Sequence, residues 1–480
     1  MANLLASLLS SAHALSVYDQ VLAVTQNNVA NASTPGYAAQ TLPLEAMELD
    51  LSTGASGGVT TGQLQSARNE YAEQAVREQN SALGQQQQAV NSFSSLQSLF
   101  DISGNIGMPY ALNQFFQSVS AWGQDPSNQA ARQTVLSNAA AVAQSFQSAA
   151  HGLQNLAHDT ETQIHSTVDQ VNSLVGQVET FNHQILETGS GGNDPGMDAQ
   201  IHATLENLSQ YISFSAIKQD DGTTSISVNG TTPLLVGDHQ YTISAGLAPA
   251  NDSGTYPNAP AVMQLRTSAG ADITNATTDG QLGALMNMRN VVLPSYLGDN
   301  NQAGDLNQMA KAFADRVNQL LTAGNISDGP PPQPGVPLFQ YDTTNDTNVA
   351  ATLTVDPTVT PDQLAVSTPG PPYVSNGVPL GLSNLATPST PADEIDGVSF
   401  TQFYGNMAAD IGRQLQQAQG GQRVQQSLVA QAQNQRQQFS GVDLNEEAMI
   451  VVEFQRAYEA NSRLITVLDQ LTEDTINILQ

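Results

Sequence analysis

The chain has 480 residues, with 13 Lys and Arg against 43 Asp and Glu, and a formal net charge of −30 at pH 7. This length exceeds the size of one hydrophobic core, so several domains are expected, and the charge disfavours nucleic acid and anionic membrane surfaces as partners. The lack of cysteine excludes disulfides, thiolate nucleophiles and cysteine metal ligands.

The N-terminal residues carry apolar side chains at a seven-residue spacing, which is typical of a coiled-coil helix. A helix is predicted from Leu4 to Asn31, and Pro35 with Gly36 is expected to end it. The amides of Asn27, Asn28 and Asn31 are expected to satisfy backbone groups at that end. One apolar row comprises Met1, Leu8, Leu15, Leu22 and Val29, and a second comprises Leu4, Tyr18 and Ala32.

Neither a secretory signal nor a membrane span is predicted. The first 67 residues contain no Lys or Arg, so the basic region of a cleavable signal is missing. No run of about 18 apolar residues occurs, as a membrane-spanning helix would require. The chain is expected to stay in the cytoplasm or to leave the cell by another route.

The interior predicts mostly long helices. Residues 40–65 favour an extended, Gly-rich arm with short strands. Residues 69–188 favour long Gln-rich helices that form a bundle and break near Gly104–Pro109 and at Asp125-Pro126. A short helix is expected at Ile201–Tyr211, and a small β domain follows at about 211–266, with a hairpin turn at Asn229-Gly230 and a strand at Tyr241–Ile243.

The C-terminal third alternates helix with a proline-rich segment. Residues 279–324 predict helix. Residues 330–391 contain 13 of the 23 prolines, so an extended lobe or linker is expected there, with its best strand at Ala351–Val355. A Gln-rich helix is predicted from Phe400 to Gln438. Gly441 then introduces a terminal helix, with Asp443 near its start.

This terminal helix carries a narrow apolar stripe like that of the N-terminal helix. Such a helix needs a partner, because most helix stability comes from burying the stripe. A helix pair within one monomer and a polymerisation device are both consistent with this pattern. The stripe comprises Ile450, Phe454, Ala457, Asn461, Leu464, Leu468, Leu471, Thr475 and Ile478.

No catalytic, cofactor or metal site is predicted. His151, His158 and His165 recur every seven residues, about 10.5 Å apart on a helix, which is too far to share a metal. Gly54–Gly58 matches the letters of a nucleophile elbow, but Val59–Gly62 is a poor helix start, so a flexible Gly-rich arm is expected instead. The sequence holds no His-Glu-x-x-His box and no phosphate loop.

The two ends together carry a specific resemblance. Asn27-Asn28-Val29-Ala30-Asn31 with Thr34-Pro35-Gly36-Tyr37, and Ser440-Gly441-Val442-Asp443-Leu444-Asn445-Glu446-Glu447 with Phe454-Gln455-Arg456-Ala457-Tyr458, resemble the terminal signatures of bacterial flagellar axial proteins of rod, hook and hook-associated type. Interior stretches such as Asp125-Pro126-Ser127-Asn128 and Gly280–Leu285 resemble the hook-associated branch. The chain departs from the family pattern in lacking the Thr-Arg pair after Gly36-Tyr37 and in its short proline-rich segment.

The resemblance implies a structural, non-enzymatic subunit that joins hook to filament by self-assembly through its terminal helices. It implies further copies of itself, the hook protein, the next hook-associated protein and an export chaperone as partners. It also implies a place outside the cell, in the flagellum, after export through the flagellar type III apparatus without signal cleavage. The nearest alternative is another axial part, hook or distal rod; a coiled-coil adaptor or adhesin would not explain both ends.

The expected fold is multidomain α+β, with a long-helix coiled-coil terminal core, a helical bundle and small β-rich outer domains. Its terminal helices are expected to order fully on assembly. The expected segments are 1–68 (axial helix and arm), 69–210 (long-helix bundle), 211–270 (β domain), 271–329 (helical return), 330–396 (proline-rich lobe) and 397–480 (C-terminal helices).

The residues expected at the assembly interface lie in the two stripes and the two terminal signatures. They are Leu8, Leu15, Leu22, Asn27, Asn28, Val29, Asn31, Pro35, Gly36, Tyr37, Gly441, Val442, Glu446, Glu447, Phe454, Gln455, Tyr458, Asn461, Leu464, Leu468 and Leu471.

Overall fold

The computed structural model describes residues 2–50, 55–100, 106–189, 194–248, 254–256 and 259–478. The chain divides into two compact units. Unit 1 comprises Met1–Leu83, Val171–Thr242 and Gln425–Gln480, and unit 2 comprises Gly84–Gln170 and Ile243–Val424. The helices α2 (Glu70–Leu99), α4 (Gln129–Thr188) and α11 (Phe400–Ser440) contribute residues to both. Long helices with small antiparallel sheets confirm the predicted multidomain α+β class.

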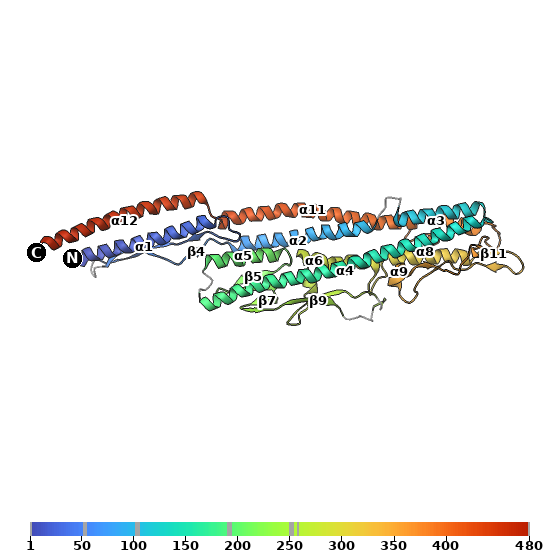
Figure 1. Ribbon diagram of the computed structural model, residues 1–480, viewed down its shortest axis with the longest axis horizontal. Coiled ribbons are helices and arrows are strands. Elements are labelled where there is room, and N and C mark those ends of the chain that lie inside the picture. The colour runs from blue at the N-terminus through green and yellow to red at the C-terminus, as the bar shows by residue number, and fades with distance from the viewer. Residues whose placement is uncertain are drawn as a thin grey trace. The chain divides into compact units, whose positions relative to one another are not determined.

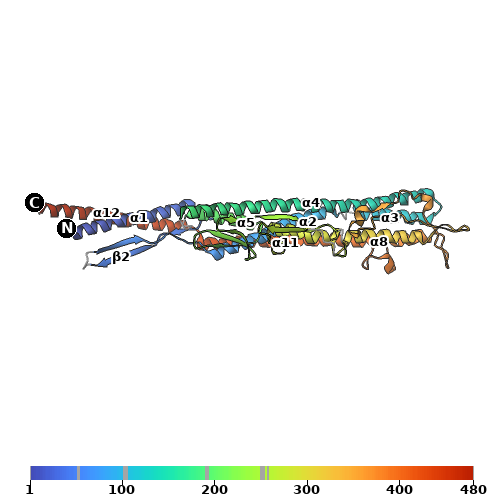
Figure 2. The same cartoon turned by 90° about the horizontal axis from the view of Figure 1, so that it is seen from below.

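The terminal helices of unit 1, α1 (Ala2–Asn31) and α12 (Leu444–Ile478), lie side by side and antiparallel (Figures 1 and 2). Helix α1 ends where predicted, before a turn in which Gly36 adopts a φ of 75°. Asp443 directly precedes helix α12, and its carboxylate accepts a hydrogen bond from the backbone N–H of Asn445 at 2.8 Å. The two stripes therefore meet within one chain.

The Gly-rich arm forms a β-hairpin. Strands β2 (Leu44–Asp50) and β3 (Ala55–Thr61) pair antiparallel, and β1 (Gln40–Thr41) pairs with β4 (Gln65–Ser66) at their base. The Ser10 hydroxyl of α1 donates to the Gly57 carbonyl at 2.9 Å. The expected extended arm with short strands is confirmed for the described residues, and Gly58 lets β3 approach Ser10 of α1; Gly54 lies outside the described residues. No helix follows β3 directly, as a nucleophile elbow requires.

A four-stranded antiparallel sheet completes unit 1, in the order β5 (Ser215–Lys218), β6 (Thr224–Val228), β7 (Thr232–Val236) and β8 (His239–Gln240). The predicted turn is confirmed, since Asn229 and Gly230 both have positive φ, 51° and 67°. The buried amide of Asn182 on α4 donates to the Thr224 carbonyl at 2.9 Å and so fixes the sheet to this helix. Helix α5 (Pro195–Ser209) begins earlier than predicted, because Asp194 caps its first turn.

Unit 2 has an aromatic core. Helices α3 (Gly107–Gln124) and α8 (Asp305–Thr322) face each other through Phe115 and Phe313, whose ring centroids lie 5.6 Å apart. Phe400 packs on the other side of Phe313 at 5.5 Å. The predicted break before α3 is present, although Gly104 lies outside the described residues. The predicted strand at Tyr241–Ile243 is displaced, because β9 covers Ile243–Leu247.

Unit 2 also contains several short elements. They are β10 (Met263–Thr267), which pairs with β9, η1 (Thr274–Ala276), α6 (Gly280–Asn287), η2 (Met288–Val292), α7 (Leu293–Leu297), β11 (Asn325–Ser327), β12 (Gln333–Pro334), β13 (Phe339–Gln340), η3 (Asp346–Asn348), α9 (Val349–Thr352), β14 (Thr354–Val355), η4 (Pro361–Gln363), α10 (Gly377–Asn384) and η5 (Pro391–Asp393).

The proline-rich segment is part of this core and not an extended lobe or linker. Leu338, Leu353, Leu364 and Leu382 are completely or almost completely buried in it. The predicted strand at 351–355 is correct only at its end, where β14 covers Thr354–Val355, because α9 occupies its first half. Proline is compatible with helix in the first turn, where no backbone donor is needed, and the short helices η4 and η5 both begin with proline.

Candidate functional site

The contact between α1 and α12 is lined on α1 by small and polar side chains. Its buried residues are Ser11, Ala14, Val17, Val21, Thr25 and Asn28. The predicted row of Leu8, Leu15, Leu22 and Val29 lies beside this line: the leucines are half-buried and Val29 is 45% exposed. Small residues let two helix axes approach closely, so the row of large apolar residues lies at the flank of the contact within one chain, and its role in assembly stays a prediction.

The predicted stripe of α12 is mostly correct. The rings of Phe454 and Tyr18 lie 5.7 Å apart, and the amide of Asn461 donates to the Ser11 carbonyl at 2.8 Å, which fixes the register of the pair. Leu464 and Leu471 are instead 49% and 48% exposed, because 3.6 residues per turn shift a seven-residue repeat around the helix. Ile450, Ala457, Tyr458, Leu468 and Thr475 are half-buried, while Gln455 is exposed; Met1 and the side chain of Ile478 lie outside the described residues.

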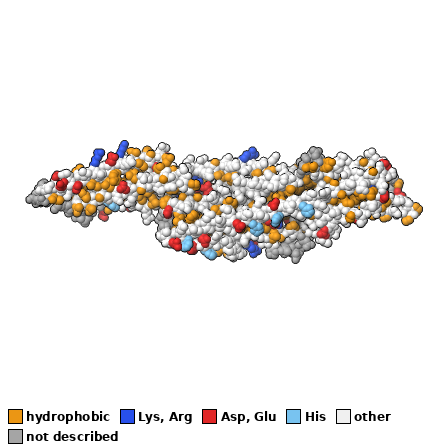
Figure 3. Space-filling view, in the orientation of Figure 1, with side chains coloured by type: hydrophobic (Ala, Val, Ile, Leu, Met, Phe, Trp, Pro, Cys, Tyr) orange, Lys and Arg blue, Asp and Glu red, His pale blue; other side chains and the backbone are white. Residues whose placement is uncertain are grey.

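The pair leaves large apolar side chains in contact with solvent. Leu5 and Leu9 on α1 are both 61% exposed, and Met449 and Val467 on α12 are 66% and 56% exposed. Figure 3 shows hydrophobic side chains on this part of the surface. Exposed large apolar side chains that gather on one part of a surface are typical of interaction sites, so the pair has the character of a surface that a neighbouring molecule covers.

Asn28 joins α1, the base of the hairpin and α12. Its amide donates to the Gln40 carbonyl at 2.8 Å and to Glu447 Oε1 at 2.7 Å, while its oxygen accepts from the Gln40 N–H at 2.9 Å and the Tyr37 hydroxyl at 2.8 Å. Burial raises the pKa of Glu447, and burial followed by the nearby Glu447 raises that of Tyr37. Asn28 thus satisfies backbone groups as expected, but within its own chain.

The other two amides lie on the surface. The Asn31 amide donates to Asn27 Oδ1 at 2.7 Å, and both residues are outside the buried contact. Pro35 is exposed in the turn that follows. Gly36 packs against α5 so closely that an added Cβ would lie 2.3 Å from the Ala199 carbonyl oxygen.

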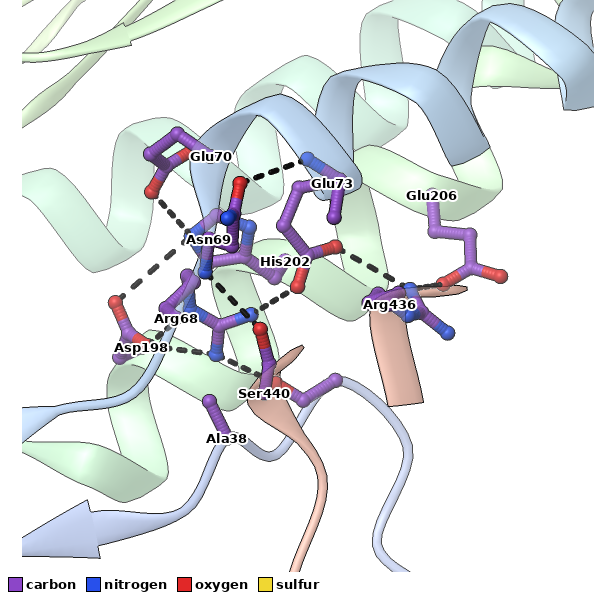
Figure 4. A network of polar contacts seen from close by, with 12 residues as sticks. Ala38, Arg68, Asn69, Glu70, Glu73, Asp198, His202, Glu206, Arg436 and Ser440 are labelled. Atoms are coloured by element: carbon purple, nitrogen blue, oxygen red, sulfur yellow. Dashed lines mark hydrogen bonds and ion pairs between the residues drawn. The ribbon is translucent and has the colours of Figure 1, made fainter. Parts of the chain in front are cut away.

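A cluster of mostly buried charges, here called the polar joint, lies next to this turn (Figure 4). It comprises Arg68, Glu70, Glu73, Asp198, His202, Glu206 and Arg436. The Arg68 guanidinium, 5% exposed, pairs with Glu73 at 2.6 Å and with Asp198 at 2.7 Å. It also donates to the Gly36 carbonyl at 2.6 Å. Arg68 therefore connects the signature turn to α2 and α5.

Arg436, the second arginine of the polar joint, connects it to α11. Arg436 pairs with Glu206 at 2.6 Å and with Glu73 at 3.2 Å. Beyond it, the Ser440 hydroxyl accepts from the Asn69 N–H at 3.0 Å, and the Ser440 carbonyl accepts from the Ala39 N–H at 2.9 Å. These contacts therefore hold the N-terminal and C-terminal signatures close together.

His202 is buried in the polar joint. Its Nε2 lies 3.7 Å from Glu70 and 3.8 Å from Asp198, and its Nδ1 has no hydrogen-bond partner. Burial, followed by repulsion from Arg68 and the other nearby cations, holds the pKa of His202 well below its ordinary value. The ring is therefore neutral at pH 7.

The sequence pattern did not single out the polar joint. One signal was available: Arg68 is the first basic residue of a chain that has only 13. In so acidic a chain, each arginine is a candidate for a defined ion pair. Its acidic partner Asp198 lies 130 residues further along the chain, and periodicity does not connect such distant positions.

Other candidate chemistry is absent from the part of the chain that the structure describes. His151, His158 and His165 are exposed on α4. No group of three or more potential metal ligands occurs among the described residues. Within the same residues, none of the helices has the length and hydropathy needed to cross a bilayer.

Comparisons with known proteins agree with the terminal signatures. Residues 433–478 match the C-terminal model of the flagellar basal body rod FlgEFG proteins. Flagellar hook-associated protein 1 of Bacillus subtilis (strain 168) is 24% identical over 97% of this chain and 96% of the relative. That of Escherichia coli (strain K12) is 32% identical over 17% of this chain and 15% of the relative.

The interior of the chain also matches known flagellar proteins. The structure of the flagellar hook junction protein FlgK from Burkholderia pseudomallei covers 76% of this chain and 99% of its own, with a TM-score of 0.62 at 15% identity, which shows a shared fold. Residues 93–339 match the helical-domain model of flagellar hook-associated protein FlgK. Because this match covers more than half of the 480 residues, the chain belongs to the flagellar hook-associated protein FlgK family.

Proposed function

We propose that this chain is a structural subunit of the bacterial flagellum that joins the hook to the filament. The observation that carries the proposal is the match of the interior, residues 93–339, to the FlgK helical domain. The relative in B. subtilis is named a hook-associated protein, and the structural relative in B. pseudomallei is described as a hook junction protein. No catalytic role is proposed.

Another axial role, as hook or distal rod protein, is the alternative. It is favoured by the match of residues 433–478 to rod proteins. That match covers only α12 and the end of α11, which the axial proteins are expected to share. The interior distinguishes the two roles, so the junction role is preferred.

Assembly is proposed to proceed through the α1–α12 pair. Leu464 and Leu471, exposed in the single chain, are available to a neighbouring copy, as are Leu5 and Leu9. Covering these leucines would stabilise the assembly by about 25 cal/mol for each Å² of apolar surface removed from water. The proposed partners are further copies, the hook protein, the next hook-associated protein and an export chaperone. The proposed location is outside the cell, after export through the flagellar type III apparatus. The six segments given above remain the proposed division of the chain, except that segment 330–396 packs into the core of unit 2 and is not a separate lobe.

The test is immunogold electron microscopy of flagella from the source organism. Label confined to a short zone between hook and filament is expected. Label along the whole hook, or at the rod, would favour the alternative. Absence of label from purified flagella would refute the proposal altogether.

Hydrogen exchange on the free subunit tests whether the terminal helices fold on assembly. Amides in residues 2–31 and 445–478 are expected to exchange rapidly beside protected amides in 140–188, because a single pair leaves much of its apolar surface exposed. Firm protection of both terminal helices in a monodisperse monomer would contradict this mechanism, and would leave the α1–α12 pair as a purely internal contact.

A further inference from the structure

Unit 1 contains a groove of about 890 Å³ at the point where α11 turns into α12. It is called the base groove here, and its apolar lining includes Val21, Leu42, Phe439, Val442, Leu444 and Phe454. Phe439 and Leu444 are more than half exposed. Within the single chain this apolar surface is left in water, so the base groove has room for side chains from outside.

The acidic lining of the base groove indicates which class of partner can bind there. Asp443, Glu446 and Glu447 line it, and its lining contains no Lys, Arg or His. Glu447 is 7% exposed; its Oε1 accepts from Asn28, but its Oε2 is buried without a hydrogen-bond partner. Asp443 and Glu446 are exposed, so a partner that brings a cation to the base groove is favoured by charge complementarity.

A surface with the matching chemistry lies on α12 itself. Its outer stripe comprises the exposed residues Met449, Val452, Arg456, Arg463 and Val467. Among the described residues neither arginine forms an ion pair. Helix α1 cannot supply such a group, since the first 67 residues contain no Lys or Arg. Ile450 and Phe454 line the base groove from a different side of α12, so the outer stripe of a chain is not directed into its own groove.

We propose that the outer stripe of one copy of this chain docks in the base groove of the next. Apolar side chains of the stripe cover Phe439 and Leu444, and its arginines face the carboxylates of Asp443, Glu446 and Glu447. Groove and stripe are different surfaces, so the contact is heterologous and repeats around a ring or along a helix. This inference rests on the proposed function, because it requires many copies in one assembly.

The test uses the absence of cysteine from the chain, which removes background in thiol cross-linking. Cells co-express full-length Glu446→Cys and Arg463→Cys variants, and flagella are isolated and treated with a short bismaleimide. A cross-linked dimer is expected when both variants are present and not with either alone. The matched control pairs Glu446→Cys with Ser462→Cys, an exposed position that is rotated about 100° around α12 from Arg463. At least about tenfold less dimer is expected for this pair, since Ser462 would face away from the base groove of the next copy.

The outcomes separate the inference from the proposed function. If the variants are present at the junction and no dimer forms above the Ser462→Cys control, the inference is refuted while the junction role stands. If the unmodified subunit is missing from flagella although the free protein is folded, as judged by circular dichroism, the proposed function is refuted.

Charge reversal provides a second readout. The double variant Arg456→Glu, Arg463→Glu is expected to enter flagella about tenfold less than the unmodified chain, because close interfacial charge pairs contribute strongly to association. The matched control is Arg266→Glu, Arg413→Glu, which reverses two exposed arginines of unit 2 and is expected to leave incorporation unchanged. Equal incorporation of the two double variants would overturn the proposed docking.

Discussion

Replacing Arg68 by alanine tests whether the polar joint stabilises unit 1. The side chain is 5% exposed and binds Glu73 at 2.6 Å, Asp198 at 2.7 Å and the Gly36 carbonyl at 2.6 Å. Its removal leaves Glu73 buried, with Arg436 at 3.2 Å as its remaining ion-pair partner. Breaking a buried ion pair by deleting one partner costs about 3–5 kcal/mol, and we expect a loss of this size in the free energy of unfolding of unit 1.

Native-state hydrogen exchange measures this loss in each unit separately. A loss of about 3 kcal/mol makes protected amides of α5 exchange more than about 100 times faster, since about 1.4 kcal/mol is tenfold. Amides of α8, in unit 2, should not change. The matched control Arg413→Ala removes an arginine that is 69% exposed and paired with Asp410, and should change stability by no more than about 1 kcal/mol. The reasoning is refuted if α5 exchange in Arg68→Ala accelerates less than tenfold.

Three further substitutions test single contacts of unit 1. The pKa of His202 is depressed in the folded chain, so the unfolded chain takes up the proton first. The contribution of His202 to stability is therefore fully present above pH 6.5 and is lost as the pH falls below it. Thermal melts between pH 7.5 and 5.5 should show a flatter dependence of melting temperature on pH for His202→Gln, and an unchanged slope would contradict this. Asn28→Ala removes a hydrogen-bond donor of the buried Glu447 carboxylate and should destabilise the α1–α12 pair by about 1–3 kcal/mol, seen as faster exchange at the start of α12 in isolated flagella, where the terminal helices are expected to be ordered. The Cβ added by Gly36→Ala would contact a backbone carbonyl, whereas the Cβ added by Gly230→Ala, at a similar positive φ, would have no atom within 4 Å. Gly36→Ala should therefore lower the melting temperature more than Gly230→Ala, and equal shifts would rule out the close contact.

Local signals predicted the helix ends and the tight turn well. Pro35 with Gly36, Asp443, and Asn229-Gly230 act within a few residues of their own position, so the sequence alone identifies them. The line of α1 that is buried within one chain was not identified, because the contact depends on which side chains are small enough to lie between two helices. Ser11 and Ala14 have that property, but a hydrophobic pattern does not register it.

Contacts between distant segments account for the remaining differences. Glu73 and Arg436 are 363 residues apart, and no pattern within α2 or α11 indicates that they meet. The proline-rich segment was expected to be extended because proline interrupts helices, yet Leu338 and Leu353 are anchored in the core of unit 2. The proposed assembly residues stay a prediction, since a single chain does not show which of them a neighbouring copy covers.

The antiparallel arrangement of α1 and α12 has a practical consequence for labelling. Tyr18 faces Phe454 and Ser11 faces Asn461, so the start of α1 and the end of α12 emerge at the same end of the pair. A fluorescent protein or affinity tag fused to either terminus would therefore occupy the same region, next to exposed Leu5 and Leu9. The Asn229-Gly230 turn is a better insertion point, because it is exposed and an added Cβ at Gly230 meets nothing within 4 Å.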